Sequence, residues 1–124
     1  MNTQEIANKL VEACRTGKSH EMQTELYSEN AVSWEQEGGN FDVKTEGLAG
    51  IRKKGEQWQS MVEEIHSSEI SDPIVAGNHF SCRMAYEVTM KNVGKIQMEE
   101  IAVYEVNDGK IVSERFFYPT APQK

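Results

Sequence analysis

The sequence has 124 residues, with 20 acidic and 13 basic side chains and a formal net charge of −7. A chain of this length is typical of one domain with one hydrophobic core, so we expect a single domain over residues 1–124. Because the basic residues are few and dispersed, a nucleic-acid partner is disfavoured. No apolar stretch is typical of a membrane span or a signal peptide, so we expect a cytoplasmic protein without a membrane partner. Cys14 and Cys82 form no C-x-x-C motif and are expected to be reduced, buried thiols.

The N-terminal part of the chain predicts two helices. Apolar residues recur at helical spacing over residues 3–16, where Asn2 and Glu5 can form a capping box. Ser19 can cap a second, shorter helix that ends near Asn30.

A short strand and a third helix follow. Residues 31–36 (AVSWEQ) predict the strand, and a loop with Gly38-Gly39-Asn40 comes after it. The spacing of Ile51 and Trp58 predicts a helix over residues 47–61.

The second half of the chain changes to an alternating pattern that predicts four long strands. They span residues 65–75, 80–90, 96–106 and 110–118. Short turns rich in glycine, asparagine and aspartate join them, as in antiparallel hairpins. Helices followed by a run of strands predict an α+β fold, with the helices packed on one face of a curved antiparallel sheet.

The alternation also predicts which side chains point inward. On the second long strand, alternate residues from Phe80 to Met90 share one face. On the third, we assign the inward face to four residues: Gln97, Glu99, Ile101 and Val103. Glu100 and Tyr104 are then expected on the outer face. On the last strand we expect Glu114, Phe116 and Tyr118 to point inward, and Arg115 and Phe117 outward.

Three segments carry a resemblance to a known family: residues 26–32 (LYSENAV), 47–51 (GLAGI) and 97–118. With the order of elements, they resemble the SnoaL-like branch of the nuclear transport factor 2-like superfamily. The resemblance implies a cone-shaped α+β barrel, in which three helices and the curved sheet enclose a pocket. It also implies a homodimer formed through the outer face of the sheet. The superfamily contains isomerases, dehydratases and cyclases as well as proteins without catalytic activity, so the fold alone does not determine the function.

The resemblance to ketosteroid isomerase, a member of this superfamily, points to Glu35. This residue matches the position of the isomerase's general base, whereas Leu10 and Ile101 match its oxyanion-hole tyrosine and protonated aspartate. Neither Leu10 nor Ile101 can donate a hydrogen bond, so ketosteroid isomerisation by that route is not expected. A carboxylate in an apolar pocket has a raised pKa, which suits proton transfer. The alternative is that Glu35 is solvated at the end of its strand.

Two further glutamates are candidates. Glu99, if it points inward, needs a partner or a proton; the alternatives are a salt bridge to Arg83 or Arg115, or a register that differs by one residue. Glu114 is expected to form a second acidic group near Glu99.

Aromatic and histidine side chains complete the candidate site. Trp34, Trp58, Tyr86, Phe116 and Tyr118 can line a pocket that stacks on a cyclic ligand, with ordinary core packing as the alternative. His66 and His79 are candidate bases, and a surface role is the alternative for each. The histidine spacing is not typical of a metal site, and no nucleotide-binding motif is present, so we expect neither a metal nor a cofactor.

These observations predict a protein that binds a small, hydrophobic or cyclic molecule. The first hypothesis is a cofactor-independent enzyme of the isomerase, cyclase or dehydratase type, with Glu35 as the base and Glu99, Tyr86 or Tyr118 orienting the substrate. The alternative is a non-catalytic module for ligand binding or dimerisation.

Overall fold

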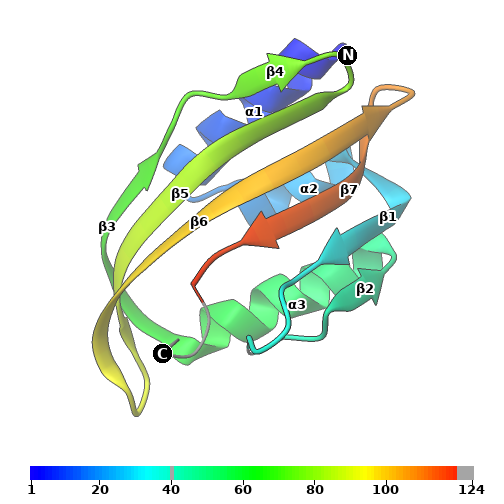
Figure 1. The fold of residues 1–124 in the computed structure, drawn as a ribbon. Coiled ribbons are helices and arrows are strands. Elements are labelled where there is room, and N and C mark those ends of the chain that lie inside the picture. The colour runs from blue at the N-terminus through cyan, green and yellow to red at the C-terminus, as the bar shows by residue number, and fades with distance from the viewer. Residues whose placement is uncertain (40, 120–124) are drawn as a thin grey trace.

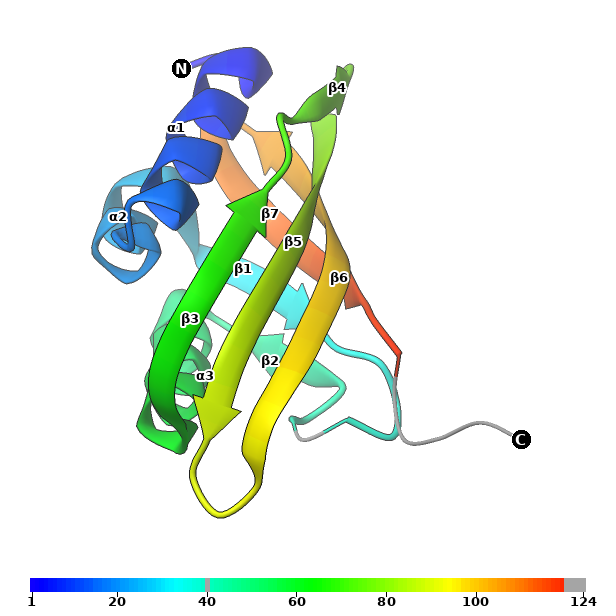
Figure 2. The same cartoon turned by 90° about the vertical axis from the view of Figure 1, so that its left-hand side faces the viewer.

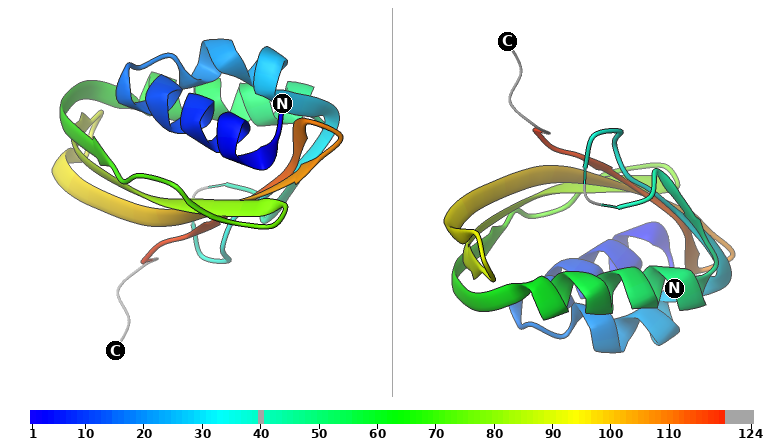
Figure 3. Two further views of the ribbon diagram at one scale, coloured as in Figure 1. Left: turned by 90° about the horizontal axis from the view of Figure 1, so that it is seen from above. Right: turned by 90° about the horizontal axis from the view of Figure 1, so that it is seen from below.

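Three helices cover one face of a curved sheet in the computed structural model of the protein, which describes residues 1–39 and 41–119 (Figure 1). The helices are α1 (Thr3–Arg15), α2 (Ser19–Leu26) and α3 (Leu48–Met61). The strands are β1 (Tyr27–Trp34), β2 (Lys44–Glu46), β3 (Val62–Ile70), β4 (Ile74–Ala76), β5 (His79–Met90), β6 (Gly94–Asn107) and β7 (Lys110–Phe117). Figure 3 shows the helices on the concave side of the sheet. The predicted α+β class is confirmed.

The sheet has the strand order β2-β1-β7-β6-β5-β3, with β4 also paired to β5 (Figure 2). β2 and β3 stand at opposite ends of this order, so the sheet is open and not a closed barrel. β1 and β7 pair in parallel, and the other pairs are antiparallel. The sheet is therefore mostly antiparallel, as expected, and the β1–β7 pair is the exception among the described strands. β1 and β7 are far apart in the chain and are not joined by a hairpin turn. The sequence therefore contains no local signal for whether they pair in parallel or antiparallel.

Helix α1 forms where the sequence predicts it. The Glu5 backbone N–H donates to Asn2 Oδ1 at 2.8 Å, and the Asn2 N–H donates to Glu5 Oε1 at 2.9 Å, which is the predicted capping box. The second helix differs from the prediction. Ser19 is its first helical residue, and the N-cap position is held by Lys18 without a side-chain hydrogen bond. It ends at Leu26 because Tyr27 already adopts an extended backbone as β1 begins.

Two of the predicted strands differ clearly from their expected bounds, and one strand was not predicted. The strand expected at 31–36 begins earlier, at Tyr27, and the short β2 was not predicted. The long strand expected at 65–75 is divided into β3 and β4 by residues 71–73. Pro73 has no N–H to donate to a neighbouring strand, and the Arg15 guanidinium occupies the Ile70 carbonyl at 2.8 Å just before the break. Asn40 in the predicted glycine-rich loop lies outside the described residues.

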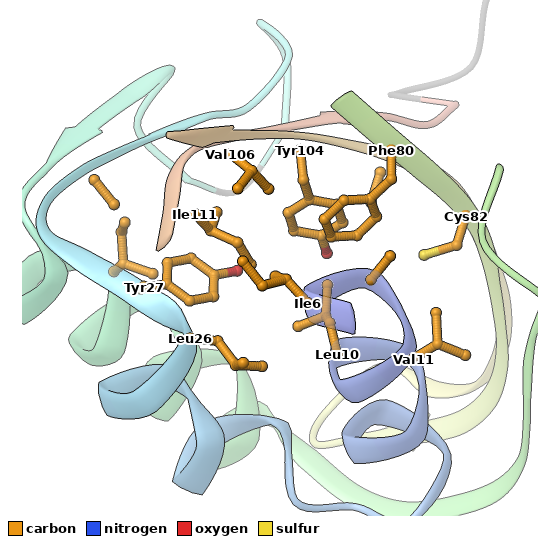
Figure 4. Close-up of a cluster of buried hydrophobic side chains, with 14 of the residues drawn as sticks. Ile6, Leu10, Val11, Leu26, Tyr27, Phe80, Cys82, Tyr104, Val106 and Ile111 are labelled. Carbon is orange, nitrogen blue, oxygen red and sulfur yellow. The ribbon is translucent and has the colours of Figure 1, made fainter. Parts of the chain in front are cut away.

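The hydrophobic core lies between α1 and the sheet (Figure 4). The Phe80 and Tyr104 rings, on adjacent strands, stack with their centroids 4.7 Å apart. Tyr104 is 2% exposed, so its predicted place on the outer face was wrong. Within the described residues, no helix is both long and apolar enough to span a bilayer. Beyond this core, towards α3, the space between helices and sheet is hollow.

Candidate functional site

A cavity of about 1100 Å³ lies between α3, the sheet and the loop after β1. This volume is in the range of pockets that bind small molecules. Its wall contains many aromatic side chains: Tyr27, Phe41, Trp58, Tyr86, Tyr104, Phe116 and Tyr118. It also contains an unusual number of carboxylates, and these differ in what surrounds them.

Glu35 lies at the cavity as part of a buried ion pair. Its carboxylate accepts hydrogen bonds from Lys54 Nζ at 2.7 Å and from the Tyr118 hydroxyl at 2.6 Å. The side chains of Glu35 and Lys54 are only 8% and 12% exposed. The backbone of Glu35 is held in place as well, because its N–H donates to the Val43 carbonyl at 2.8 Å. The solvated alternative for Glu35 is therefore wrong, and a cation already neutralises this carboxylate.

The polar contacts continue from Lys54 into the core. Lys54 Nζ also donates to Ser33 Oγ at 2.5 Å, and the Ser33 hydroxyl donates to Glu114 Oε2 at 2.7 Å. The Tyr27 hydroxyl donates to the other oxygen of Glu114. Six groups thus form one chain, which we call the polar chain: Tyr118, Glu35, Lys54, Ser33, Glu114 and Tyr27.

Glu114 points inward, as predicted, and is 4% exposed. Burial raises the pKa of its carboxyl group, while the hydrogen bonds from Tyr27 and Ser33 and the charge of Lys54 act in the opposite direction. Both carboxylate oxygens have a donor, so this glutamate is structurally satisfied.

The direction assigned to β6 was wrong by one residue. Met84 of β5 stands opposite Glu100, and opposite residues of an antiparallel pair share a face. Glu100 therefore points into the cavity. Glu99 points outward and pairs with Arg83, which was the stated alternative. Ile101 is 51% exposed on the outer face, so its match to an inward-facing aspartate was also wrong.

Glu100 differs from the other two inward-facing glutamates because it has no hydrogen-bond or ion-pair partner among residues 1–39 and 41–119. Burial raises the pKa of this carboxyl group to about 7, and the nearby charges of Glu35 and Glu114 add to the effect. The positive charge of Lys54 lowers this pKa, but its effect is the smallest of the four. The residue that the sequence analysis placed outside is thus the carboxylate best suited to exchange a proton near neutral pH.

The predicted aromatic residues divide into two groups. Trp58 and Tyr86 line the cavity with their ring centroids 6.0 Å apart and their planes at 51°. The Tyr86 hydroxyl makes one contact in the described structure, a weak one of 3.8 Å with Met84 Sδ. Phe116 and Tyr118 line the cavity too.

Trp34 and His79 are not at the cavity. The Trp34 ring lies between two cations, 5.1 Å from Lys44 Nζ and 4.7 Å from the Arg115 guanidinium carbon. His79 is half exposed, and its Nε2 lies 4.0 Å from a Glu105 carboxylate oxygen. His66 is bonded through its Nε2 to the Thr89 hydroxyl at 2.7 Å and does not line the cavity either.

Sequence reasoning missed Lys54 and Ser33. Lys54 follows Ile51 by three residues and precedes Trp58 by four, so helical spacing already places it on the inward face of α3. A lysine in that stripe was the available signal. Ser33 lies two residues after the buried Ala31 and shares its face.

The thiols and possible metal ligands offer no alternative chemistry. Burial raises the pKa of Cys14 to about 12 and that of Cys82 to about 11, so neither is a thiolate near neutral pH. Within the ranges 1–39 and 41–119, no three His, Cys, Asp or Glu side chains are placed to hold a metal ion.

Comparisons with known proteins agree with this architecture. The family model described as SnoaL-like domain matches residues 1–118. A proposed SnoaL-like polyketide cyclase from Mesorhizobium loti is 30% identical, with a TM-score of 0.87, over 95% of this chain and 100% of its own. None of the curated proteins matches the chain.

Two more distant structures share the fold. A proposed isomerase from Bacillus subtilis is 23% identical with a TM-score of 0.75, over 96% of this chain and 90% of its own. A Catenulispora acidiphila protein with a ketosteroid isomerase-like fold was solved with trimethylamine. It is 18% identical with a TM-score of 0.72, over 94% of this chain and 87% of its own.

Proposed function

Because the chain belongs to the SnoaL-like family, whose model matches residues 1–118, we propose that it binds a small organic molecule in its cavity and catalyses a proton transfer on it without a cofactor. The observation that carries the proposal is the unpartnered, inward-facing Glu100 carboxylate beside the polar chain. The similarity to a proposed cyclase supports the same class of reaction. The complex of the Catenulispora neighbour with trimethylamine supports a cavity for small ligands in this fold.

The proposed step is abstraction of a proton from a carbon next to a carbonyl group. Glu100 takes the proton as the C–H bond breaks, and the electron pair moves onto the carbonyl oxygen. The Tyr86 hydroxyl is the donor for that oxygen, because its only contact in the described structure is with a sulfur. Return of the proton to another carbon gives an isomerase. If the enolate carbon instead attacks a second carbonyl group of the substrate, the C=O π bond breaks, the new alkoxide takes the proton back from Glu100, and the result is a cyclase.

The polar chain has a supporting role in this proposal. Glu35, which we expected to be the base, accepts hydrogen bonds on both carboxylate oxygens, from Lys54 and from Tyr118, so neither oxygen is free to face a substrate. It is therefore a positioning residue. Its negative charge also raises the pKa of Glu100.

The test is the exchange of carbon-bound hydrogen for deuterium in small cyclic ketones, followed by proton NMR in D₂O. The wild-type protein is expected to accelerate exchange, with a rate that rises as Glu100 loses its proton around pH 7. Glu100→Gln is expected to reduce the catalysed rate by about 10² or more. Glu99→Gln is the matched control: it removes the neighbouring carboxylate on the opposite face and is expected to leave the rate unchanged.

Equal rates for the wild type and Glu100→Gln would remove Glu100 from the mechanism. Ligand binding without any exchange across the ketones would favour the alternative, a non-catalytic binding module.

We further propose a homodimer through the outer face of the sheet. Ile101 and Phe117 stand opposite each other there, 51% and 45% exposed, beside a hollow of about 230 Å³. Apolar side chains in this arrangement are typical of a contact surface. Sedimentation is expected to show a dimer at micromolar concentration and a monomer for Ile101→Lys. A wild-type monomer would contradict this proposal.

A further inference from the structure

The cavity contains one carboxylate, Glu100, and one buried acceptor, the Gln23 side-chain oxygen, that have no partner among the described residues. We propose that its ligand carries a positively charged amine, held by the Glu100 carboxylate and the Trp58–Tyr86 aromatic pair. The inference names the substrate class for the proposed site, and it rests on that proposal in taking the cavity to be a ligand site. A carboxylate has two oxygens, so one oxygen of Glu100 can face the ammonium group while the other accepts the proton of the proposed reaction.

The first argument is the pairing of charges around the cavity. Two basic side chains of the helices line it, and each already faces a carboxylate other than Glu100. Lys54 contacts Glu35 at 2.7 Å, and His20 Nε2 lies 3.3 Å from a Glu56 oxygen without a hydrogen bond to it. Arg83 stands opposite Ile101 on the outer face of the sheet, where it contacts Glu99. Glu100 therefore lacks a counter-ion among the described residues. A positively charged ligand would neutralise its carboxylate.

The remaining acidic groups of the lining do not change this balance. Glu114 is bonded to two hydroxyl groups, and Glu87 lies 3.7 Å from Lys95. Glu69 is exposed at the rim. An anionic ligand would meet several carboxylates and no basic side chain without an ion pair in the described part of the chain, so a carboxylate or phosphate ligand is disfavoured.

The second argument is the aromatic wall beside Glu100. Tyr86 stands opposite Met98, one inward position along from the Met84–Glu100 pair, so its ring and the carboxylate share the same part of the sheet. Trp58 faces Tyr86 from α3 with its ring tilted at 51°. The faces of two aromatic rings that are tilted towards each other both attract a cation. A nearby carboxylate adds a negative charge that strengthens this attraction.

The third argument is an unmatched hydrogen-bond acceptor. The Gln23 side-chain oxygen is buried in the cavity wall and accepts no hydrogen bond from the described residues. A buried acceptor without a donor is costly, and an ammonium group brings several N–H donors. Gln23 and Glu100 therefore both require what a protonated amine supplies.

The test uses three probes with the same ring and different charges: benzylamine, benzyl alcohol and benzoate. At pH 8 benzylamine is protonated and Glu100 is mostly charged. Titration followed by NMR is expected to show benzylamine binding at least about tenfold more tightly than benzyl alcohol, with benzoate weakest.

Two variants and one control connect this preference to the residues. Glu100→Gln is expected to reduce benzylamine affinity to the level of benzyl alcohol, whereas Glu99→Gln is expected to leave both affinities unchanged. Trp58→Leu is expected to weaken benzylamine by about three- to tenfold and benzyl alcohol less, because only the cation loses a charge–ring attraction. Circular dichroism of each variant shows whether the fold is intact.

Several outcomes would overturn the inference: no binding of benzylamine, equal or tighter binding of benzyl alcohol or benzoate, or a preference that survives in Glu100→Gln. These outcomes are separate from failure of the proposed proton transfer. Selective amine binding without deuterium exchange would retain the ligand class and reject the reaction. Exchange that requires Glu100 in a protein that prefers neutral probes would retain the reaction and reject the ligand class.

Discussion

At the scale of single residues, three glutamates that point inward have three different environments. Glu114 accepts hydrogen bonds from two hydroxyl groups, and Glu35 is paired with Lys54. Glu100 has neither kind of partner among the described residues, so its charge is poorly stabilised. The residue type is the same in each case, and the neighbours decide which of them can give up or take a proton near neutral pH.

This difference predicts how the stability of the protein depends on pH. The pKa of Glu100 rises from its usual 4.5 to about 7 in the folded protein, so the folded state binds this proton more tightly than the unfolded state. Glu100 therefore destabilises the fold increasingly as pH rises from 4.5 to about 7, and by a constant amount above that. Glu100→Gln is expected to be more stable than the wild type by about 1–3 kcal/mol at pH 8.5 and equal to it near pH 4.5.

Urea unfolding at both pH values measures the effect. Glu99→Gln provides the control, because Glu99 is exposed and paired with Arg83. If the wild type is as stable as Glu100→Gln at pH 8.5, the negative charge of Glu100 does not destabilise the fold.

At the scale of elements, local signals predicted helices and turns well. Asn92 and Asp108 have φ values of +65° and +51° in two of the turns that were read from asparagine, aspartate and glycine. The inward face of β6 was predicted wrongly. Alternation shows two faces but not which is inside, and Glu100 interrupts an otherwise apolar row. The hairpin turn at 92–94 could have shown which face of β6 is inward. It places Glu100 opposite Met84, which belongs to the row of β5 that shares a face with Phe80.

The capping box of α1 gives a prediction at this scale. Asn2→Ala removes the side chain that accepts from the Glu5 N–H, and it is expected to lower the free energy of unfolding by about 1 kcal/mol. Asn2→Asp keeps an acceptor at the same place and is expected to retain wild-type stability. Thermal or urea unfolding measures both, and equal losses in the two variants would assign the effect to something other than the cap.

At the scale of the whole molecule, the sequence supplied most members of the site but not their contacts. Glu35, Trp58, Tyr86, Glu114, Phe116 and Tyr118 were all candidates that the structure places at the cavity. The contact of Glu35 with Lys54 was not predictable, since it depends on how α3 crosses the end of β1. The parallel pairing of β1 with β7, which brings Ser33 to Glu114, is equally absent from any local pattern.

The strand order predicts which strands unfold locally and which unfold only with the whole molecule. β4 has three residues and one partner strand, and β2 has three residues at an edge. β6 has fourteen residues and is paired on both sides. Hydrogen exchange by NMR is expected to show amides in β2 and β4 exchanging by local opening, and those in the centre of β6 only by global unfolding. Amides of β4 that are protected as strongly as those of β6 would contradict this.

The contact between Glu35 and Tyr118 has a consequence for synthesis of the protein. The two residues are 83 positions apart, and β7, which leads to Tyr118, also carries Glu114. A chain leaving the ribosome contains Glu35 and Lys54 long before Glu114 and Tyr118 have been made, although N-terminal parts begin to fold during translation. The nascent chain therefore has helices and a partial sheet but an incomplete cavity wall. The proposed ligand site is therefore complete only after the last strand has been translated.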